Sequence, residues 1–223
     1  MEGKILFTGI IEEVGTLKSK YSSKDRFQLE IKAQNVVKKL TRGESIAVNG
    51  VCLTVISFTD NSFTADIMPE TLKKTNLEKT NQGSKLNLEL PLTPEDFMGG
   101  HLVSGHIDGT GMVNNIQPEK NAKIIEVELD SELNKFMVDK GSVALNGVSL
   151  TIMELSKNSL KVSLIPETLN QTNFKFVNQG EKVNIETDLI GKYVVKMLEN
   201  YREQNSGHDT SIDEDFLKDK GFF

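Results

Sequence analysis

Two short segments of the chain combine small polar side chains with an apolar strand pattern, and they are nearly the same segment. The two segments are "VNGVCLTV" at residues 48–55 and "LNGVSLTI" at residues 145–152. The chemically most important difference is that Cys52 of the first is aligned with Ser149 of the second. Strand side chains alternate between two faces, so the apolar residues of each segment face a core, and Cys52 and Thr54 face away from it. One such strand is explained by β-propensity alone. Two copies with the same polar face predict a small-ligand pocket that is built twice.

Other familiar catalytic patterns are absent from the sequence. The three histidines and the single cysteine are too scattered for a cysteine-rich zinc site. On a strand, His101 and His106 of "HLVSGH" would point to opposite faces, so no shared metal is expected. There is no phosphate-binding loop, no G-x-G-x-x-G and no G-x-S-x-G turn. His101 is expected to be structural. His106 is more informative, because the first copy has Ile10 at its position, although a lone histidine is more often an ordinary surface residue.

Composition narrows the class of protein. The 223 residues carry a net charge of −6, which argues against a nucleic-acid partner. The start "MEGKILFTGI" does not have the features of a signal or transit peptide, and no apolar run is long enough to cross a membrane. The single cysteine fits a reducing compartment. A cytoplasmic protein without a membrane partner is therefore expected.

The whole chain is a tandem duplication. Residues 45–89 align with residues 142–186 at an offset of 97, and nearly half of the pairs are identical. Further upstream the offset is 96, and "FTGIIEEVG" pairs with "VSGHIDGTG". The halves meet at "DFMGGH", where two glycines serve either as a hinge or as a point of close backbone approach. We expect a first domain over 1–98, a second over 99–188, a helix over 189–203 and a tail over 204–223.

Each half is predicted to be all-β. "RFQLEI", "SFTADI" and "KLNLEL" alternate apolar and polar residues, and the second half repeats the pattern in "IIEVEL" and "KVNIET". Short strands separated by turn residues favour two small antiparallel barrels over one open sheet. Short helices fit only near "NVVKKL" and "SELNKFM", and "PETL" in each half resembles a turn that opens a helix.

The pattern changes after residue 188. "LIGKYVVKMLENYREQ" places an apolar stripe at helical spacing on a charged segment, formed by Ile190, Val194, Met197 and Tyr201. The stripe either packs back on its own domain or meets copies of itself in an oligomer. The remaining acidic tail is expected to be loosely ordered.

Six motifs in order carry a family resemblance. "FTGIIEEVG", "VNGVCLTV", "GGHLVSGHIDGTG", "LNGVSLTI", "LIPETLNQTN" and "VNIETDLIGKYV" together resemble the riboflavin synthase family of the alpha-chain type, across about residues 7–200. The resemblance implies two six-stranded Greek-key barrels and a trimer joined by C-terminal helices. It implies the dismutation of two 6,7-dimethyl-8-ribityllumazine molecules to riboflavin and a pyrimidinedione, without a metal or redox cofactor. The site would lie between the first barrel of one subunit and the second barrel of its neighbour. Lumazine synthase is a candidate protein partner.

The resemblance also carries residue roles. The ligand-contacting positions of the first barrel would be Gly9, Ile10, Ile11, Ser45, Cys52, Leu53, Thr54, Asp66, Ile67, Met68, Pro69, Glu70 and Thr71. Those of the second barrel would be Gly105, His106, Ile107, Lys140, Ser149, Leu150, Thr151, Ser163, Leu164, Ile165, Pro166, Glu167 and Thr168. The catalytic positions would be Phe7, Thr8, Cys52, His106, Ser149, Thr151 and Asp188.

Two further functions fit the same fold. Lumazine-carrying fluorescent proteins resemble this family but do not turn over substrate, and a structural flavin-binding scaffold fits the composition equally well. The retained "SGHI" and "GVSLTI" in the second half favour the enzyme.

Overall fold

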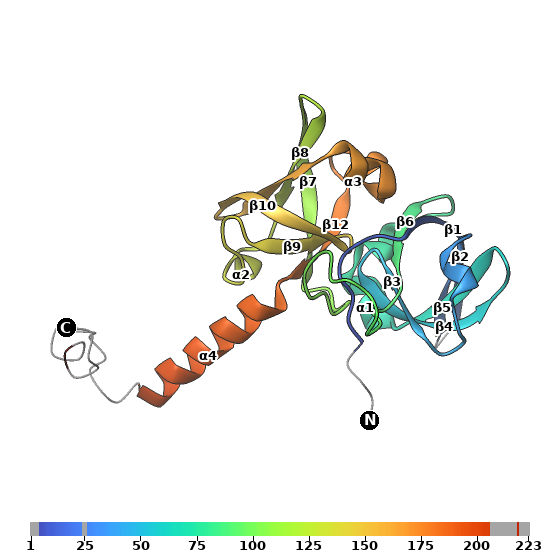
Figure 1. The fold of residues 1–223 in the computed structure, drawn as a ribbon, viewed down its shortest axis with the longest axis horizontal. Helices are drawn as coiled ribbons and strands as arrows, with labels where there is room; N and C mark the ends of the chain where they lie inside the picture. Colours follow the sequence, from blue (N-terminus) through green and yellow to red (C-terminus); the bar gives the residue numbers. More distant parts are fainter. Residues whose placement is uncertain (1–4, 24–25, 206–217, 219–223) are drawn as a thin grey trace.

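The computed structural model describes residues 5–23, 26–205 and 218, and within them the chain forms two closed antiparallel barrels followed by one long helix (Figure 1). The first barrel has the strand order β1-β2-β5-β4-β3-β6, and the second has the equivalent order β7-β8-β11-β10-β9-β12. Such an order, in which the second strand of each barrel pairs with the fifth, is a Greek-key arrangement. The all-β prediction of two six-stranded barrels with a C-terminal helix is confirmed.

The element bounds follow the duplication. The first barrel comprises β1 (Glu13–Ser23), β2 (Arg26–Lys32), η1 (Val36–Lys38), β3 (Ser45–Val48), β4 (Val51–Phe58), β5 (Ser62–Ile67), α1 (Pro69–Lys74), η2 (Asn76–Lys79) and β6 (Lys85–Glu89). The second comprises β7 (Gly109–Glu119), β8 (Ala122–Glu128), α2 (Ser131–Asn134), β9 (Ser142–Leu145), β10 (Val148–Ser156), β11 (Ser159–Leu164), α3 (Pro166–Gln171), η3 (Asn173–Lys175) and β12 (Lys182–Thr187). The short helices at "NVVKKL", "SELNKFM" and both "PETL" segments are confirmed.

Strand alternation builds each core as expected. In β4 the valines and Leu53 are buried, whereas Cys52 is half-buried and Thr54 is exposed. The equivalent strand β10 buries Val148 and Ile152 and exposes Thr151. The two cores are separate clusters, one per barrel. Each pocket-forming strand is therefore held by its own apolar face, which leaves its polar face available at the surface.

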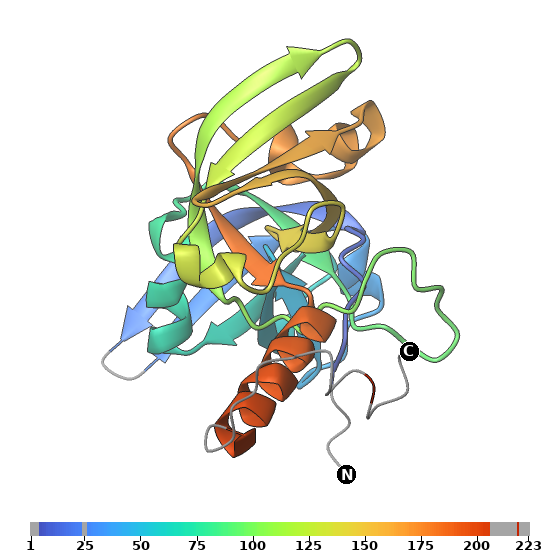
Figure 2. The same ribbon diagram turned by 90° about the vertical axis from the view of Figure 1, so that its left-hand side faces the viewer.

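Strands β6 and β12 break the alternation because both of their faces are covered. Asn87 and Glu89 of β6 are buried, as are Asn184 and Glu186 of β12. The two barrels lie against each other (Figure 2), and Asn87 and Asn184 each bond a backbone carbonyl of the other barrel there. Polar side chains can be buried there because they bond across the interface.

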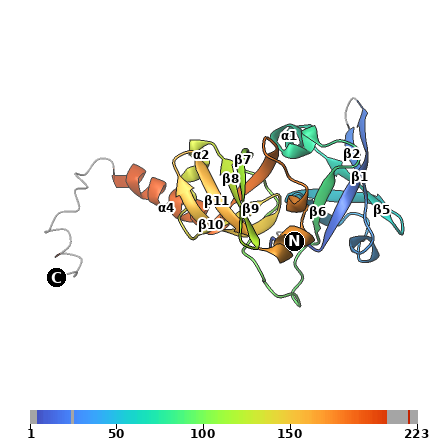
Figure 3. The same cartoon turned by 90° about the horizontal axis from the view of Figure 1, so that it is seen from above.

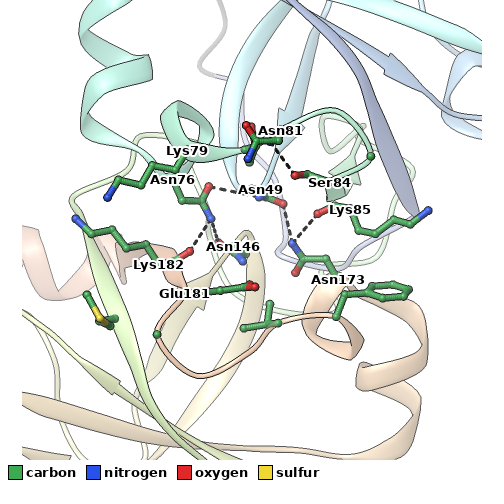
Figure 4. A pocket seen from close by; sticks show the side chains of 16 residues that line it. Asn49, Asn76, Lys79, Asn81, Ser84, Lys85, Asn146, Asn173, Glu181 and Lys182 are labelled. Atoms are coloured by element: carbon green, nitrogen blue, oxygen red, sulfur yellow. Dashed lines mark hydrogen bonds between the residues drawn. The ribbon is translucent and has the colours of Figure 1, made fainter.

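Six asparagines, related in pairs by the duplication, join the barrels: Asn49, Asn76, Asn87, Asn146, Asn173 and Asn184. Asn87 donates from Nδ2 to the Asn146 carbonyl at 2.9 Å, and Asn184 makes the same bond to the Asn49 carbonyl at 2.9 Å. A polar cavity of about 610 Å³ opens beside this network (Figure 4). The network fixes the relative orientation of the two barrels.

We expect Asn87→Ala to lower the free energy of unfolding by about 2–4 kcal/mol, because it leaves several buried partners without a hydrogen bond. Asn87 Oδ1 also accepts the backbone N–H of Asn173 at 2.6 Å. Chemical denaturation measures the effect, with Asn81→Ala at the exposed rim of the same cavity as the control. Equal stabilities of the two variants would contradict the role of the network.

The last helix, α4 (Leu189–Asn205), is joined to the second barrel at its start. Asp188 Oδ1 accepts the Ile190 N–H at 2.9 Å, and Lys192 pairs with Asp108 at 2.7 Å. Beyond these contacts the helix projects away from the second barrel (Figures 1 and 3). Ile190, Val194 and Met197 are 62%, 50% and 71% exposed, so the alternative that the stripe packs back on its own domain is wrong.

Apart from Lys218, the acidic tail beyond Asn205 lies outside the described residues. Within the described part of the chain, none of the helices combines the length and the apolar character that a membrane-spanning segment needs.

Candidate functional site

A cavity of about 770 Å³ lies against the polar face of the first barrel. Its walls come from β4, from the end of β5 with α1, and from the segment that precedes β7. The lining includes the predicted residues Cys52, Leu53, Thr54, Asp66, Ile67, Met68, Pro69, Glu70, Thr71, Gly105, His106 and Ile107. A cavity of this size, with an apolar floor and a few polar groups, suits a small organic ligand.

The cavity shows that the two halves exchange loops. The Gly105 carbonyl accepts the Cys52 N–H at 2.9 Å, and the Gly9 carbonyl accepts the Ser149 N–H at 2.8 Å. Assigning Gly9, Ile10 and Ile11 to the first barrel's pocket, and Gly105, His106 and Ile107 to the second's, was therefore wrong. Each loop lies against the pocket strand of the other barrel, and His106 belongs to the same half-site as Cys52.

The exchange has a physical cause in the backbone between the barrels. Phe7 and Val103 form an antiparallel bridge, with hydrogen bonds of 2.7 and 3.1 Å, that carries each loop across the interface. Gly9 and Gly105 follow with φ of 76° and 79°. A Cβ at Gly105 would lie 2.5 Å from the Cβ of Cys52, so only glycine permits the close approach.

Two buried carboxylates anchor the exchanged loops. Glu89 accepts the N–H groups of Thr8 and Gly9 and the hydroxyl of Thr8, at 2.7–3.1 Å. Glu186 accepts the N–H groups of Ser104 and Gly105 and the hydroxyl of Ser104, at 2.7–3.0 Å. Burial raises the pKa of Glu186, and it raises the pKa of Glu89 to about 7, although the hydrogen bonds oppose the change.

We expect Glu89 to make stability depend on pH between its unfolded pKa near 4.5 and its folded pKa near 7. In this window the folded state binds more protons than the unfolded state, so stability falls as pH rises and levels off above it. The free energy of unfolding, relative to that of Glu89→Gln, should fall by up to about 3 kcal/mol across the window. Denaturation of both proteins from pH 4.5 to 8 measures this, and parallel curves would contradict it.

Cys52 is placed as a neutral polar contact in the first half-site. Burial raises the pKa of its thiol, and a hydrogen bond with Ser45 only partly opposes this. The thiol is therefore mainly protonated at neutral pH, unlike a reactive cysteine. Ser45 itself is buried beneath β4, opposite Thr54 in the strand register.

The second half-site carries a different pair of polar groups. Ser149 Oγ lies 2.7 Å from Nδ1 of His101, whose ring is buried and whose Nε2 lacks a hydrogen-bond partner among the described residues. Burial lowers the pKa of His101, opposed by the charge of Asp188. The imidazole is therefore neutral at pH 7. His101 is structural, as expected, but its contact with Ser149 has no signature in the local sequence.

The segment that contains both histidines is not a strand. Residues 101–106 lie outside the named strands and make a single bridge at Val103, so the expected strand geometry of the histidine pair was wrong. His101 instead contacts Ser149, and the exposed His106 contacts Ser104. Among the described residues, no group of three or more His, Cys, Asp or Glu side chains is arranged to hold a metal ion.

The glycines before His101 resolve the choice between a hinge and a close approach. A Cβ at Gly100 would lie 2.1 Å from the Thr8 carbonyl oxygen and 2.8 Å from the Cβ of Ser149. The close approach is therefore confirmed at Gly100.

The remaining predicted residues occupy varied places. Phe7 is fully buried in a cluster between the barrels with Ala47, Val103 and Ala144, so it positions the site and does not line it. The side chains of Ile67 and Leu164 are buried in the barrel cores. Nζ of Lys140 bonds the Met153 carbonyl at 2.9 Å.

Other predicted positions of the second half-site lie where the duplication puts them. Leu150 and Thr151 continue β10 after Ser149, Ser163 ends β11 with Leu164, and α3 begins at Pro166. The preceding Ile165 is largely exposed, and Glu167 and Thr168 follow in the first turn of α3. Asp188 precedes α4, and its carboxylate accepts the N–H of Ile190 in the first turn of that helix.

Known proteins share these features. A family model described as the lumazine binding domain matches the chain twice, over residues 8–91 and 104–188. The riboflavin synthase of Bacillus subtilis is 44% identical over 97% of this chain and 100% of its own length, and that of Actinobacillus pleuropneumoniae is 40% identical over the same shares.

Solved structures agree with the sequence matches. The crystal structure of LumP complexed with riboflavin is similar with a TM-score of 0.75 and 26% identity, over 81% of this chain and 98% of that one. LumP complexed with 6,7-dimethyl-8-(1'-D-ribityl) lumazine gives a TM-score of 0.73 and 25% identity over the same shares. With both halves matched and nearly full-length relatives aligned, this chain belongs to the riboflavin synthase family of proteins with two lumazine-binding domains.

Proposed function

We propose that this protein is a riboflavin synthase. It transfers a four-carbon unit between two molecules of 6,7-dimethyl-8-(1-D-ribityl)lumazine, and the products are riboflavin and 5-amino-6-(D-ribitylamino)uracil. The observation that carries the proposal is the pair of equivalent half-sites in one chain, each made from one barrel and the exchanged loop of the other. A reaction between two identical molecules needs two similar binding surfaces. The identity of 44% to a riboflavin synthase over nearly the full chain supports it.

The half-sites suit this chemistry because the reaction needs orientation more than a strong nucleophile. A proton must leave a methyl group of one lumazine, and the resulting anion must meet the second ring face to face. In the first half-site, His106 supplies an imidazole and Cys52 a neutral contact. In the second, Ser149 supplies an uncharged polar contact and is held by the buried His101. The two products contain all the atoms of the two substrates, so the proposed reaction needs no external oxidant or reductant.

We also propose the finer features that the family resemblance implies. The protein acts as a transferase in the cytoplasm, and it forms a homotrimer in which the first half-site of one subunit faces the second half-site of its neighbour. The exposed apolar stripe on α4 supports self-association. An association with lumazine synthase stays a prediction.

A lumazine carrier without catalysis is the second candidate. The similarity to LumP complexed with riboflavin and with its lumazine favours it, because the same fold in that protein binds these ligands.

Incubation of the purified protein with the lumazine separates the two functions. The enzyme should form riboflavin continuously, with two lumazines consumed for each riboflavin, in the presence of EDTA as well as without it. The carrier should bind lumazine in a fixed ratio and form no riboflavin over many binding lifetimes. Chromatography of reactants and products, with heat-denatured protein as a control, measures both outcomes.

A further inference from the structure

A chain of hydrogen bonds runs from a buried carboxylate to the imidazole of the first half-site. Ser104 Oγ lies 2.7 Å from Oε1 of Glu186 and 3.2 Å from Nδ1 of His106. The backbone N–H of His106 also points to Ser104 Oγ, at 3.3 Å. Glu186 is buried, Ser104 is partly buried and His106 is exposed at the cavity. The chain therefore connects the protein interior to the ligand surface.

The donors and acceptors along this chain determine where the protons lie. Glu186 accepts three hydrogen bonds, from two backbone N–H groups and from the Ser104 hydroxyl. These bonds favour its ionised form and oppose the effect of burial on its pKa, and an ionised carboxylate can only accept. The single hydroxyl proton of Ser104 is therefore used toward Glu186. The oxygen of Ser104 can then act toward His106 only as an acceptor, so Nδ1 of a neutral imidazole must carry the ring proton.

We propose that Glu186 and Ser104 are positioning residues that hold His106 in the tautomer with its proton on Nδ1 and with Nε2 unprotonated. The inference rests on the proposed function for the use of this nitrogen, because an unprotonated Nε2 is what a general base at the half-site needs. Glu186 and Ser104 are not among the described residues that line the cavity, and they act through the ring. The tautomer itself is a property of the chain that exists with or without turnover.

The other half of the molecule contains the same scaffold without the ring. The Thr8 hydroxyl bonds Oε1 of Glu89 at 2.8 Å, and the Ile10 N–H points to Thr8 Oγ at 3.3 Å. Each carboxylate and hydroxyl therefore shapes its loop in both halves. Only in the loop with His106 does the same arrangement also determine which ring nitrogen of a histidine carries the proton. This pseudo-symmetry supplies a matched conservative variant, because Ser104→Thr copies the hydroxyl residue of the first loop.

Nitrogen NMR of histidine-labelled protein tests the tautomer directly. The chain has three histidines, and the spectrum of His106→Gln identifies the signals of His106 by their loss. We expect Nδ1 of His106 to be protonated in the wild type and in Ser104→Thr. In Ser104→Ala the Nε2–H form should predominate, because the acceptor for Nδ1–H is gone. Glu186→Ala should also increase the Nε2–H form, because no side-chain oxygen then accepts the Ser104 hydroxyl and it can turn toward the ring.

Kinetics supply the second measurement. Ser104→Ala should lower kcat about tenfold or more with little change in KM, and Ser104→Thr should restore it. An Nδ1–H tautomer that persists in Ser104→Ala would overturn the proposal, and so would equal losses of kcat in the alanine and threonine variants. Failure of the wild type to form riboflavin would instead refute the proposed function, and the NMR result would still decide the tautomer.

Discussion

Replacing His106 by isoleucine is expected to lower kcat and kcat/KM together by about 100-fold, with little loss of lumazine binding. Isoleucine is the residue that the first copy has at this position, and Ile10 lies there on an equivalent backbone. The loop should therefore keep its shape, since Glu186 holds it through Ser104 and Gly105. What is lost is the imidazole of His106, which lines the first half-site.

Steady-state kinetics and equilibrium binding of the lumazine measure the two effects separately. Cys52→Ser is the matched control, because it copies the residue of the second half and sits in the same half-site. A hydroxyl replaces a neutral thiol as a small polar contact, so this change should be the milder of the two. If Cys52→Ser lowers kcat more than His106→Ile does, the main catalytic group of this half-site is the thiol and His106 has another role.

The barrels could be predicted from the sequence because their causes are local. Alternation of apolar residues in β4 and β10 reflects a core on one side and a polar face on the other, and the duplication doubles each observation. The turn that begins each "PETL" helix depends only on the proline and its neighbours. Properties that depend on a few consecutive residues are visible in those residues.

The exchange of loops was not predictable in the same way. Gly105 and His106 belong to the second half in sequence, yet they pack against Cys52 of the first half because two complete barrels meet along β6 and β12. Asn87 and Glu89 gave only a weak indication of this contact. They are polar residues in a strand, and alternation alone places such residues in solvent. Asn87 and Glu89 are buried because the second barrel packs against β6, and the alternation pattern of a strand does not predict which surface will cover it.

The pair of His101 and Ser149 shows the same limit. The residues are 48 positions apart, and they meet because the backbone at Gly100 passes close to β10. Ser149 could be predicted as a site residue from its strand, and Gly100 as a special position from the conformational freedom of glycine, but nothing in either segment specified their contact. Local chemistry could be predicted, whereas the assembly of the half-sites required the packing of one barrel on the other.

Removal of residues from Gly191 onward is expected to leave both barrels folded, to abolish the proposed trimer and to remove most of the activity. The two barrel cores contain no residue of α4, so folding of each barrel does not depend on the helix. The proposed site joins half-sites of neighbouring subunits, so a monomer would hold its two lumazines apart and lose the gain from face-to-face orientation. Sedimentation and the riboflavin assay measure both losses on the same sample.

A single substitution makes the same test without shortening the chain. Met197 is 71% exposed in the isolated subunit, so Met197→Lys costs the folded monomer little, but in an assembled interface it buries a charge that has no partner. Glu199→Lys, two positions further and therefore on another face of the helix, introduces the same lysine outside the stripe. We expect Met197→Lys to sediment as a folded monomer with little activity, and Glu199→Lys to stay an active trimer. An active trimer in Met197→Lys would mean that another surface assembles the subunits, because an apolar contact at this position cannot accept an unpaired lysine without a large loss of association energy.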